Sequence, residues 1–406
     1  MVINLKALGL VVEYNPFHNG HFYHITESKK ETKADVVIAV MSGNFLQRGE
    51  PAIVSKWTRT KMALQSGVDL VVELPYAFAT QKAETFANGA VSILEALHCH
   101  SLCFGSELGE ISPFLHVNEF LIQKKEQYDM LIKQHITSGV SYPSALTSAF
   151  KELSNEEEML DLSLPNNILG FHYVKAIYRQ QANIKPYTIK RTSAGFHEQA
   201  FVSPTIASAT SIRKALLSKE KPITQYVPKA TFQNLGEYEQ NYGLLHHWEH
   251  YFHLLKYTIM TMSNEDLFNI YEVEEGLENR IRKNILEAEG FQDFMERLKT
   301  KRYTWTRLQR LCTHILTRTT KKQMSYIGPN QESPYIRLLG MSQLGQEYLG
   351  TVKKQLVVPV ISKLSTFQHP LLELDIKASH TYNMIFPEPL RSKTMKTEFA
   401  TPPIRI

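Results

Sequence analysis

Cysteine is scarce in this chain, with three residues among 406. Cys99, Cys103 and Cys312 are too few and too unevenly spaced for a disulfide framework, and Cys99 and Cys103 lack the second pair that a zinc site would need. No apolar run approaches the roughly 20 residues that span a bilayer, and the first residues lack a secretory pattern. We therefore expect a cytoplasmic protein with no metal site of its own and no membrane partner.

A strong excess of one charge is also missing. The formal net charge is +5 and the pI is about 8.8, so the chain is mildly basic. This balance permits an acidic partner such as RNA without requiring one. Hydrophobic residues make up 43% of the 406 residues, which is enough for a large core, and the length predicts two or three domains.

The first strand, turn and helix carry the strongest functional pattern. Leu8–Val12 is a short apolar run typical of a buried strand, and Asn15-Pro16 ends it. His18-Asn19-Gly20-His21 follows, at the start of a predicted helix. Free backbone N–H groups and the positive end of the helix dipole favour an anion there, and the glycine lets the backbone approach a phosphate. The two histidines share one helical face, where imidazoles can donate to phosphoryl oxygens.

A single histidine near a helix start is more often a surface or capping residue. The complete arrangement, however, resembles the His-x-Gly-His signature of the nucleotidyltransferase superfamily. Members of that superfamily attack the α-phosphate of ATP and release pyrophosphate. The resemblance indicates the class of reaction more strongly than it indicates the substrate.

Strands and helices alternate along the first half of the chain. Ala34–Met41 and Asp69–Leu74 are near-continuous apolar runs, Ser101–Phe104 is a further strand, and helical segments separate them. This order predicts an α/β fold with a doubly wound, Rossmann-like parallel sheet, which binds ligands at the carboxyl ends of its strands. Candidates for a phosphate or carboxylate at that edge are Ser42, Gly43, Asn44 and Arg48. The next cations, Lys56, Arg59 and Lys61, fit a solvated helix face.

Two later turns have related chemistry. A fifth strand, Tyr187–Lys190, is followed directly by Arg191. Residues 206–216 form a hydroxyl-rich turn entering a helix, in which Ser211 and Arg213 can hold the β- and γ-phosphates. That turn resembles the Ser/Thr-x-Ile-Arg signature that cradles pyrophosphate in nucleotidyltransferases. Asn166 and Asn167, before another helix, also fit plain N-caps.

Taken together, these segments resemble the bacterial tRNA(Met) cytidine acetate ligase family. The matching segments are Glu13–His21, Met41–Phe45, Phe104–Glu107, Pro165–Gly170 and Ala207–Arg213. In that family, ATP and acetate form acetyl-adenylate, and the acetyl group passes to N4 of the wobble cytidine of elongator tRNA(Met). The resemblance therefore implies ATP, acetate and this tRNA as ligands, and we expect Mg²⁺ to bridge the phosphates.

The resemblance also implies site residues. We expect His18 and His21 to be catalytic by stabilising charge on the phosphoryl oxygens. The expected ATP-binding residues are Val11, Val12, Glu13, Tyr14, Asn15, Pro16, Phe17, His18, Asn19, Gly20, His21, Phe22, Tyr23, His24, Gly105, Asn166, Arg191, Ser211 and Arg213. The candidates for acetate or phosphate remain Ser42, Gly43, Asn44 and Arg48.

We predict three regions. Residues 1–222 form the nucleotidyltransferase domain, with a helical insertion near 111–158. Residues 223–390 form a mainly helical domain with a small α/β portion, and 391–406 form a flexible tail. A basic, aromatic-containing segment in the second region is either a solvated helix face or a surface for tRNA phosphates. Its candidate contacts are Arg297, Lys301, Arg302, Arg307 and Arg310.

Two other functions fit the same residues. One is a small-molecule adenylyltransferase of cofactor biosynthesis, in which the product keeps the nucleotide and the basic segment is incidental. The other is a nucleotide-binding protein that interacts with RNA and does not turn over. Acetate-dependent ATP–pyrophosphate exchange and the fate of the activated product distinguish the three.

Overall fold

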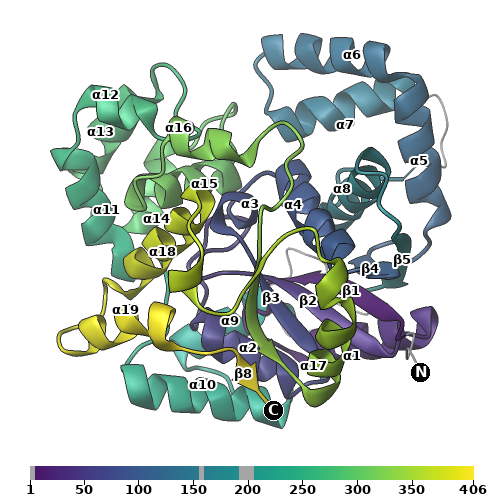
Figure 1. The fold of residues 1–406 in the computed structure, drawn as a ribbon. Coiled ribbons are helices and arrows are strands. Elements are labelled where there is room, and N and C mark those ends of the chain that lie inside the picture. Colours follow the sequence, from purple (N-terminus) through teal and green to yellow (C-terminus); the bar gives the residue numbers. More distant parts are fainter. Residues whose placement is uncertain (1–4, 155–159, 192–204) are drawn as a thin grey trace.

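The fold is organised around one sheet, whose order in the described residues is β5-β4-β1-β2-β3-β6-β7, with β8 paired to β6 (Figure 1). The computed structural model describes residues 5–154, 160–191 and 205–406. Five strands run parallel: β1 (Ala7–Val12), β2 (Val36–Ser42), β3 (Leu70–Leu74), β4 (Ser101–Ser106) and β5 (Lys185–Lys190). The expected Rossmann-like parallel sheet is confirmed.

The central strands are covered on both faces. All seven residues of β2 are buried, as a parallel strand between two helical layers requires. Val36, Ile38 and Val40 belong to one apolar cluster, whereas Val37 and Ala39 belong to a second one on the opposite face. The sheet therefore has two cores, one on each side.

Helices from the first 242 residues contribute to both layers. The first cluster includes residues of α4 (Ala83–Ala96) and α8 (Pro165–Arg179), and the second includes residues of α1 (Asn19–Thr32), α2 (Lys56–Leu64), α9 (Ala209–Ser218) and α10 (Lys229–Tyr242). The short helix α3 (Tyr76–Ala79) links β3 to α4. In the described residues no helix has the length and apolarity to cross a bilayer.

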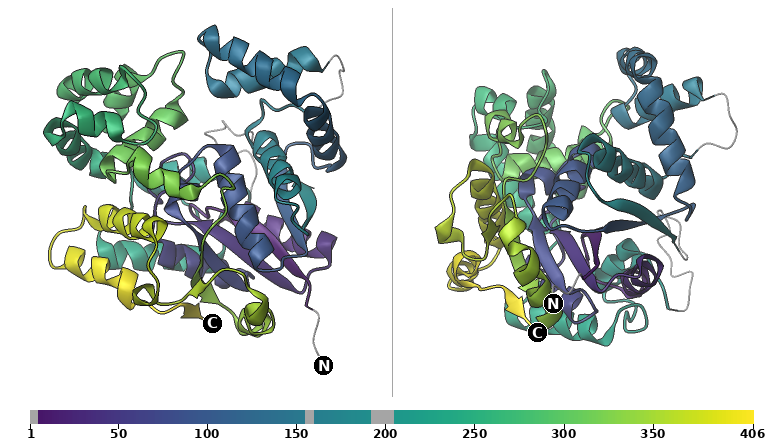
Figure 2. Two further views of the ribbon diagram at one scale, coloured as in Figure 1. Left: turned by 45° about the horizontal axis from the view of Figure 1, so that its top comes forward. Right: turned by 45° about the vertical axis from the view of Figure 1, so that its right-hand side comes forward.

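Two further groups of helices stand on the sheet domain (Figures 1 and 2). One contains α5 (Ser112–Gln123), α6 (Lys125–Thr137) and α7 (Tyr142–Leu153), and residues 155–158 of the expected insertion lie outside the described residues. The other contains α11 (Glu249–Thr261), α12 (Asn264–Asn269), α13 (Leu277–Glu287), α14 (Phe291–Leu298), α15 (Trp305–Leu316) and α16 (Lys321–Met324). The second group shares the large apolar cluster of the sheet domain, so it is packed firmly against it.

The last 70 residues return to the main sheet. Strand β6 (Ile336–Met341) pairs antiparallel with β3, and β7 (Val360–Ile361) pairs with β6. Between and after them lie α17 (Gln343–Val352) and α18 (Pro370–Asn383). The expected small α/β portion is therefore an extension of the main sheet.

The prediction of a flexible tail at 391–406 is wrong. Residues Leu390–Ala400 form helix α19, and Ile404–Arg405 form β8, which pairs with β6. Glu398 in this helix is 2% exposed and forms ion pairs with Lys56 and Arg337. The segment lies beyond the motifs that carried the resemblance, and its partners are elsewhere in the chain.

Candidate active site

The turn after β1 places two histidines at the N-terminus of α1. His18 is the N-cap residue, and its Nδ1 accepts a hydrogen bond from the Gly20 amide at 3.0 Å. In return, the His18 amide donates to Nδ1 of His21 at 3.3 Å, so the two side chains complete a reciprocal capping box. The rings stack with centroids 3.7 Å apart.

Burial and capping together determine the protonation state and the tautomer of both rings. Burial lowers the pKa of His18 to about 3 and that of His21 well below 6.5, and the charge of Arg191 contributes to both shifts. The imidazoles are therefore neutral at pH 7. Since each Nδ1 accepts a backbone N–H, the single proton of each ring resides on Nε2. The arrangement provides two Nε2–H donors at a helix N-terminus, as the sequence pattern predicts for a phosphate site.

Gly20 leaves the backbone accessible, and it also leaves room for the His18 ring. A Cβ atom at this position would lie 2.8 Å from Cε1 and 3.0 Å from Nδ1 of His18. Any side chain would therefore displace the capping imidazole. The glycine is required by the histidine two residues before it.

Arg191 and Gly105 meet where β4 and β5 end. The Arg191 amide donates to the Ser106 carbonyl at 3.0 Å, and a Cβ on Gly105 would lie 3.3 Å from Cγ of Arg191. The positive charge of Arg191 also lowers the pKa of His24, after burial, which brings it to about 4. The structure thus brings Arg191 within electrostatic reach of His18, His21 and His24, as expected for one phosphate-binding site.

A second helix N-terminus is tied to the first. The Ser208 hydroxyl caps α9 by accepting the Ser211 amide at 3.1 Å. Arg213, in the first turns of α9, donates to the Asn15 carbonyl at 3.0 Å and to Oε2 of Glu50 at 3.1 Å. Asn19 binds the carbonyls of Thr205 and Gln225 at 2.8 and 2.9 Å. Two positive helix ends therefore converge, which favours a ligand with several phosphates.

Acidic and basic side chains form a cluster beside the N-termini of α1 and α9. Glu13 accepts the Gln47 amide at 2.8 Å. Burial raises the pKa of Glu13, and the nearby charge of Glu50 raises it further, while Arg48 and Arg213 act in the opposite direction. Arg48 therefore lies in the same charged cluster as Arg213. Sequence reasoning did not assign Glu50, although its place beside Arg48 in a turn at a strand end was the available signal.

Asn166 lies in the first turn of α8, which begins at Pro165, so it is not the N-cap residue. The helix end is capped by Glu107, whose Oε1 accepts the Asn166 side chain at 2.6 Å and whose Oε2 accepts the Asn167 amide at 2.9 Å. The alternative of plain asparagine caps is wrong for that reason. Glu107 was visible in the Phe104–Glu107 segment but was not assigned a role.

Ser42, Gly43 and Asn44 lie at the carboxyl end of β2 and are buried. The carbonyls of Ser42 and Gly43 accept hydrogen bonds from the Arg59 guanidinium, and Oδ1 of Asn44 accepts the Lys56 amide at 3.0 Å. These contacts give the turn a supporting role in the sheet. Of the four candidates for acetate or phosphate, Arg48 is the one within the charged cluster.

The prediction of a solvated face for Lys56 and Arg59 is wrong. Both are buried, and Arg59 also binds the Glu13 carbonyl at 2.6 Å, which joins the ends of β1 and β2. Lys56 lies between Glu73 at 2.7 Å and Glu398 at 2.6 Å. Only Lys61 of the three cations is partly exposed, with its ammonium 3.0 Å from Glu237.

The basic segment of the second region is divided by burial. Lys301 and Arg302 are exposed, whereas Arg310 is 9% exposed and lies 3.1 Å from Glu272. Arg302 and Arg307 both pair with Glu274, and Arg297 pairs with Asp293 and Glu287. The cations on α14, α15 and their connection are therefore partly neutralised by acids.

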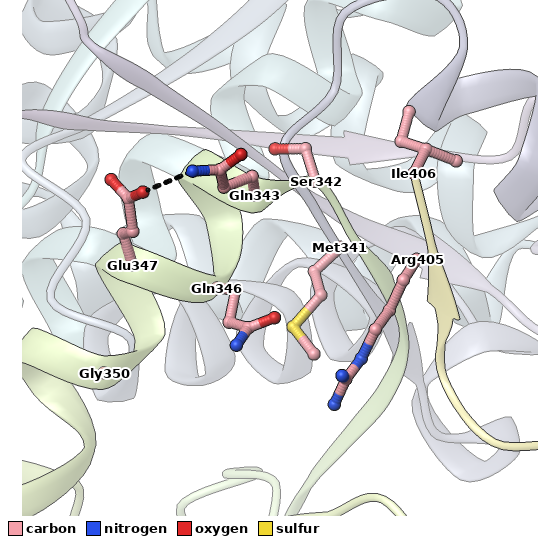
Figure 3. A pocket seen from close by; sticks show the side chains of 8 residues that line it. All are labelled: Met341, Ser342, Gln343, Gln346, Glu347, Gly350, Arg405 and Ile406. Carbon is pink, nitrogen blue, oxygen red and sulfur yellow. Dashed lines mark hydrogen bonds between the residues drawn. The ribbon is translucent and has the colours of Figure 1, made fainter.

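A hollow of about 380 Å³ lies away from this site (Figure 3). Its lining includes Met341, Ser342 and Arg405. Because Met341 pairs with Leu70, the first residue of β3, the hollow is at the amino ends of the parallel strands. His18 and Arg191 lie at the carboxyl ends.

Comparison with known proteins finds similarity along the whole chain. A family model described as HIGH Nucleotidyl Transferase matches residues 5–398. A tRNA(Met) cytidine acetate ligase of Geobacillus sp. (strain WCH70) is 53% identical over 405 residues, covering 98% of this chain and 100% of the relative. The protein of that name from Bacillus subtilis (strain 168) is 52% identical over 404 residues, covering 99% and 97%.

Solved structures are similar as well. The apo crystal structure of Thermotoga maritima TmcAL has a TM-score of 0.91 at 33% identity and covers 99% of this chain and 100% of its own. The structure of the same protein bound with alpha-thio ATP has a TM-score of 0.89 at 33% identity, with 99% coverage of both chains.

Proposed function

We propose a function from the premise that this chain belongs to the HIGH nucleotidyl transferase family and that its relatives include the tRNA(Met) cytidine acetate ligases. The protein is itself a tRNA(Met) cytidine acetate ligase. It activates acetate with ATP and transfers the acetyl group to N4 of the wobble cytidine of elongator tRNA(Met), in the cytoplasm where that tRNA works. The proposal is carried by the two helix N-termini and two neutral imidazoles that meet at the carboxyl edge of the sheet.

In the first step, a carboxylate oxygen of acetate attacks the α-phosphorus of ATP. The bond to the bridging oxygen breaks, pyrophosphate leaves, and acetyl-adenylate remains. Nε2–H of His18 and of His21 donate to the phosphoryl oxygens as their charge increases. No nucleophile of the protein is needed, so positioning and electrostatics provide the rate.

The leaving pyrophosphate is held by the α9 turn. Ser211 and Arg213 are in that turn, and Arg191 approaches from the end of β5. Arg48 is the cation that we assign to acetate or to a phosphate. In the described residues no three His, Cys, Asp or Glu side chains form a metal-binding group. Mg²⁺ bound with the nucleotide would supply neutralisation of the phosphate charge.

In the second step, the N4 amine of cytidine attacks the acetyl carbonyl carbon. AMP leaves and the amine loses one proton. The cytidine must be unstacked in a single-stranded loop for the amine to reach the carbonyl. We assign tRNA contacts to the helices of residues 223–390, where Lys301 and Arg302 are exposed, and adenylate formation to residues 1–222.

The decisive experiment has two stages. Acetate-dependent ATP–pyrophosphate exchange is measured first, and total tRNA is then added and analysed by nucleoside mass spectrometry. We expect exchange without tRNA, and N4-acetylcytidine when tRNA is present. A stable nucleotide-containing metabolite would instead indicate a small-molecule adenylyltransferase, and no exchange would indicate a non-catalytic nucleotide-binding protein.

A further inference from the structure

The connection between β2 and α2 touches two parts of the molecule at once. Residues Leu46–Glu50, which we name the bridging loop, close on themselves: the Leu46 amide donates to the Glu50 carbonyl and the Gly49 amide to the Leu46 carbonyl, each at 2.9 Å. An antiparallel bridge between Phe45 and Pro51 closes its base. The loop is thus a compact, internally hydrogen-bonded unit.

One side of the bridging loop belongs to the candidate active site. The Gln47 amide donates to Glu13, directly after β1, and Glu50 binds Arg213 of the α9 turn at 3.1 Å. Arg48 lies between these contacts and acts electrostatically on Glu13. The position of the loop therefore sets the position of Arg213 and Arg48.

The other side is held by helices of the C-terminal part. Gln309 on α15 donates through Nε2 to the Arg48 carbonyl at 2.9 Å. The Thr313 hydroxyl donates to the Gly49 carbonyl at 2.7 Å, and Nε1 of Trp248, at the start of α11, donates to the same carbonyl at 3.1 Å. All three side chains are buried, and Gln309 and Thr313 are four residues apart on one helical face.

The backbone of the bridging loop packs tightly against α15. Gly49 has a φ of +79°, and a Cβ there would lie 2.6 Å from both Cα and N of Arg310. The loop backbone thus packs directly on the backbone of α15. A shift of α15 must move the loop, because both sides of the interface are backbone.

We propose that Thr313, Gln309 and Trp248 are positioning residues for adenylate formation, acting through the bridging loop on Arg213 and Arg48. The inference rests on the proposed function for its reaction but concerns residues outside the nucleotide site.

The test compares variants that remove individual hydrogen-bond donors to the loop. Thr313→Val removes the hydroxyl and keeps the shape, and Thr313→Val with Trp248→Phe leaves the Gly49 carbonyl without either side-chain donor. We expect the KM for ATP in the exchange reaction to rise about threefold to tenfold in the single variant and further in the double variant. Thr313→Ser, which keeps the hydroxyl, should restore the wild-type value.

Thr317→Val is the matched control. Thr317, the C-cap residue of α15, is also buried, and its hydroxyl bonds to the Thr313 carbonyl, Tyr76 and Thr319 rather than to the loop. Thr317→Val should lower the melting temperature and leave the KM for ATP unchanged. If Thr313→Val lowers only the melting temperature, as the control does, the positioning role is refuted.

Two measurements separate this inference from the proposed function. In a Glu50→Gln background, Thr313→Val should have a smaller effect on ATP affinity than in the wild type, because both act through the same loop. Additive effects would overturn the inference. Calorimetric binding of a non-hydrolysable ATP analogue reports the same coupling without turnover, so it decides the inference even if acetate-dependent exchange were absent.

Discussion

The backbone amide of His18 donates to the ring of His21, and the ring of His18 accepts the amide of Gly20. Each histidine therefore caps the helix with Nδ1 and presents Nε2–H on its other side. In the proposed mechanism, capping and donation to the phosphoryl oxygens use opposite nitrogens of the same ring. This division explains how neutral imidazoles can serve as fixed donors at pH 7, since the cap holds the tautomer and burial lowers the pKa of both.

Replacing His21 with alanine should slow adenylate formation by about 10²–10³-fold, because one preorganised donor to the phosphoryl oxygens is removed. The measurement is the rate of acetate-dependent ATP–pyrophosphate exchange. His172→Ala is the control, since His172 is buried on α8 and its pKa is also lowered, to about 4. That variant should lose stability but keep its exchange rate. An unchanged rate in His21→Ala would remove His21 from the mechanism.

The buried histidines also set the pH dependence of folding. Burial lowers the pKa of His18 to about 3 and of His24, His172 and His314 to about 4, and it lowers those of His21 and His246 well below 6.5. Below pH 6.5 the unfolded chain binds protons that the folded chain does not. The free energy of unfolding should therefore fall as pH falls from 6.5 towards 4.

Two carboxyl groups oppose this trend, Glu13, whose pKa is raised by burial, and Asp375. Burial and the charge of Glu73 raise the pKa of Asp375 to about 7, so the folded chain keeps a proton there that the unfolded chain releases above its ordinary value of 3.8. These two carboxyl groups do not offset six histidines. The urea midpoint should be lower at pH 5 than at pH 7. His172→Phe should make this difference smaller, because it removes the one proton that His172 of the unfolded chain binds. Equal midpoints at the two pH values would contradict the prediction.

The sequence predicted the site where its signals are local. The β-branched strands, the proline-ended turn and the two histidines lie within about one strand and one helix, so short-range rules of burial and capping apply. The sequence did not predict the burial of Lys56 because its partner Glu398 is 342 residues away. Helical spacing identifies a face, but it does not tell which part of the chain will cover that face.

The ion pairs of Glu398 should make the C-terminal helix essential for stability. Burial by itself would raise the pKa of Glu398, but the charges of Lys56 and Arg337 lower that pKa to about 2. Glu398→Ala would leave those cations with Glu73 as their remaining carboxylate, at a cost of about 3–5 kcal/mol. Chemical denaturation measures this loss. Glu388→Ala, at an exposed ion pair 3.9 Å long, should cost much less stability than Glu398→Ala. Similar losses in the two variants would contradict the assigned role of Glu398.

The basic segment shows why charge counts alone are a poor guide to an RNA surface. Arg310 is paired with Glu272 and covered, and Arg307 shares Glu274 with Arg302. The acids precede the cations by about one or two helices, so the sequence contained them, but only the fold shows which cations they neutralise. The exposed pair Lys301 and Arg302 is therefore the best remaining candidate for binding phosphates.

Lys301→Gln with Arg302→Gln should weaken binding of elongator tRNA(Met) and reduce the slope of log affinity against log salt by about 0.7–0.9 for each phosphate that is no longer neutralised. ATP–pyrophosphate exchange without tRNA should be unchanged, since neither residue is among those proposed to bind ATP. Lys393→Gln with Lys396→Gln removes the same charge from exposed positions on α19 and is the matched control. If both pairs of substitutions reduce affinity and salt slope equally, binding depends only on net charge, and the tRNA surface does not include residues 301 and 302.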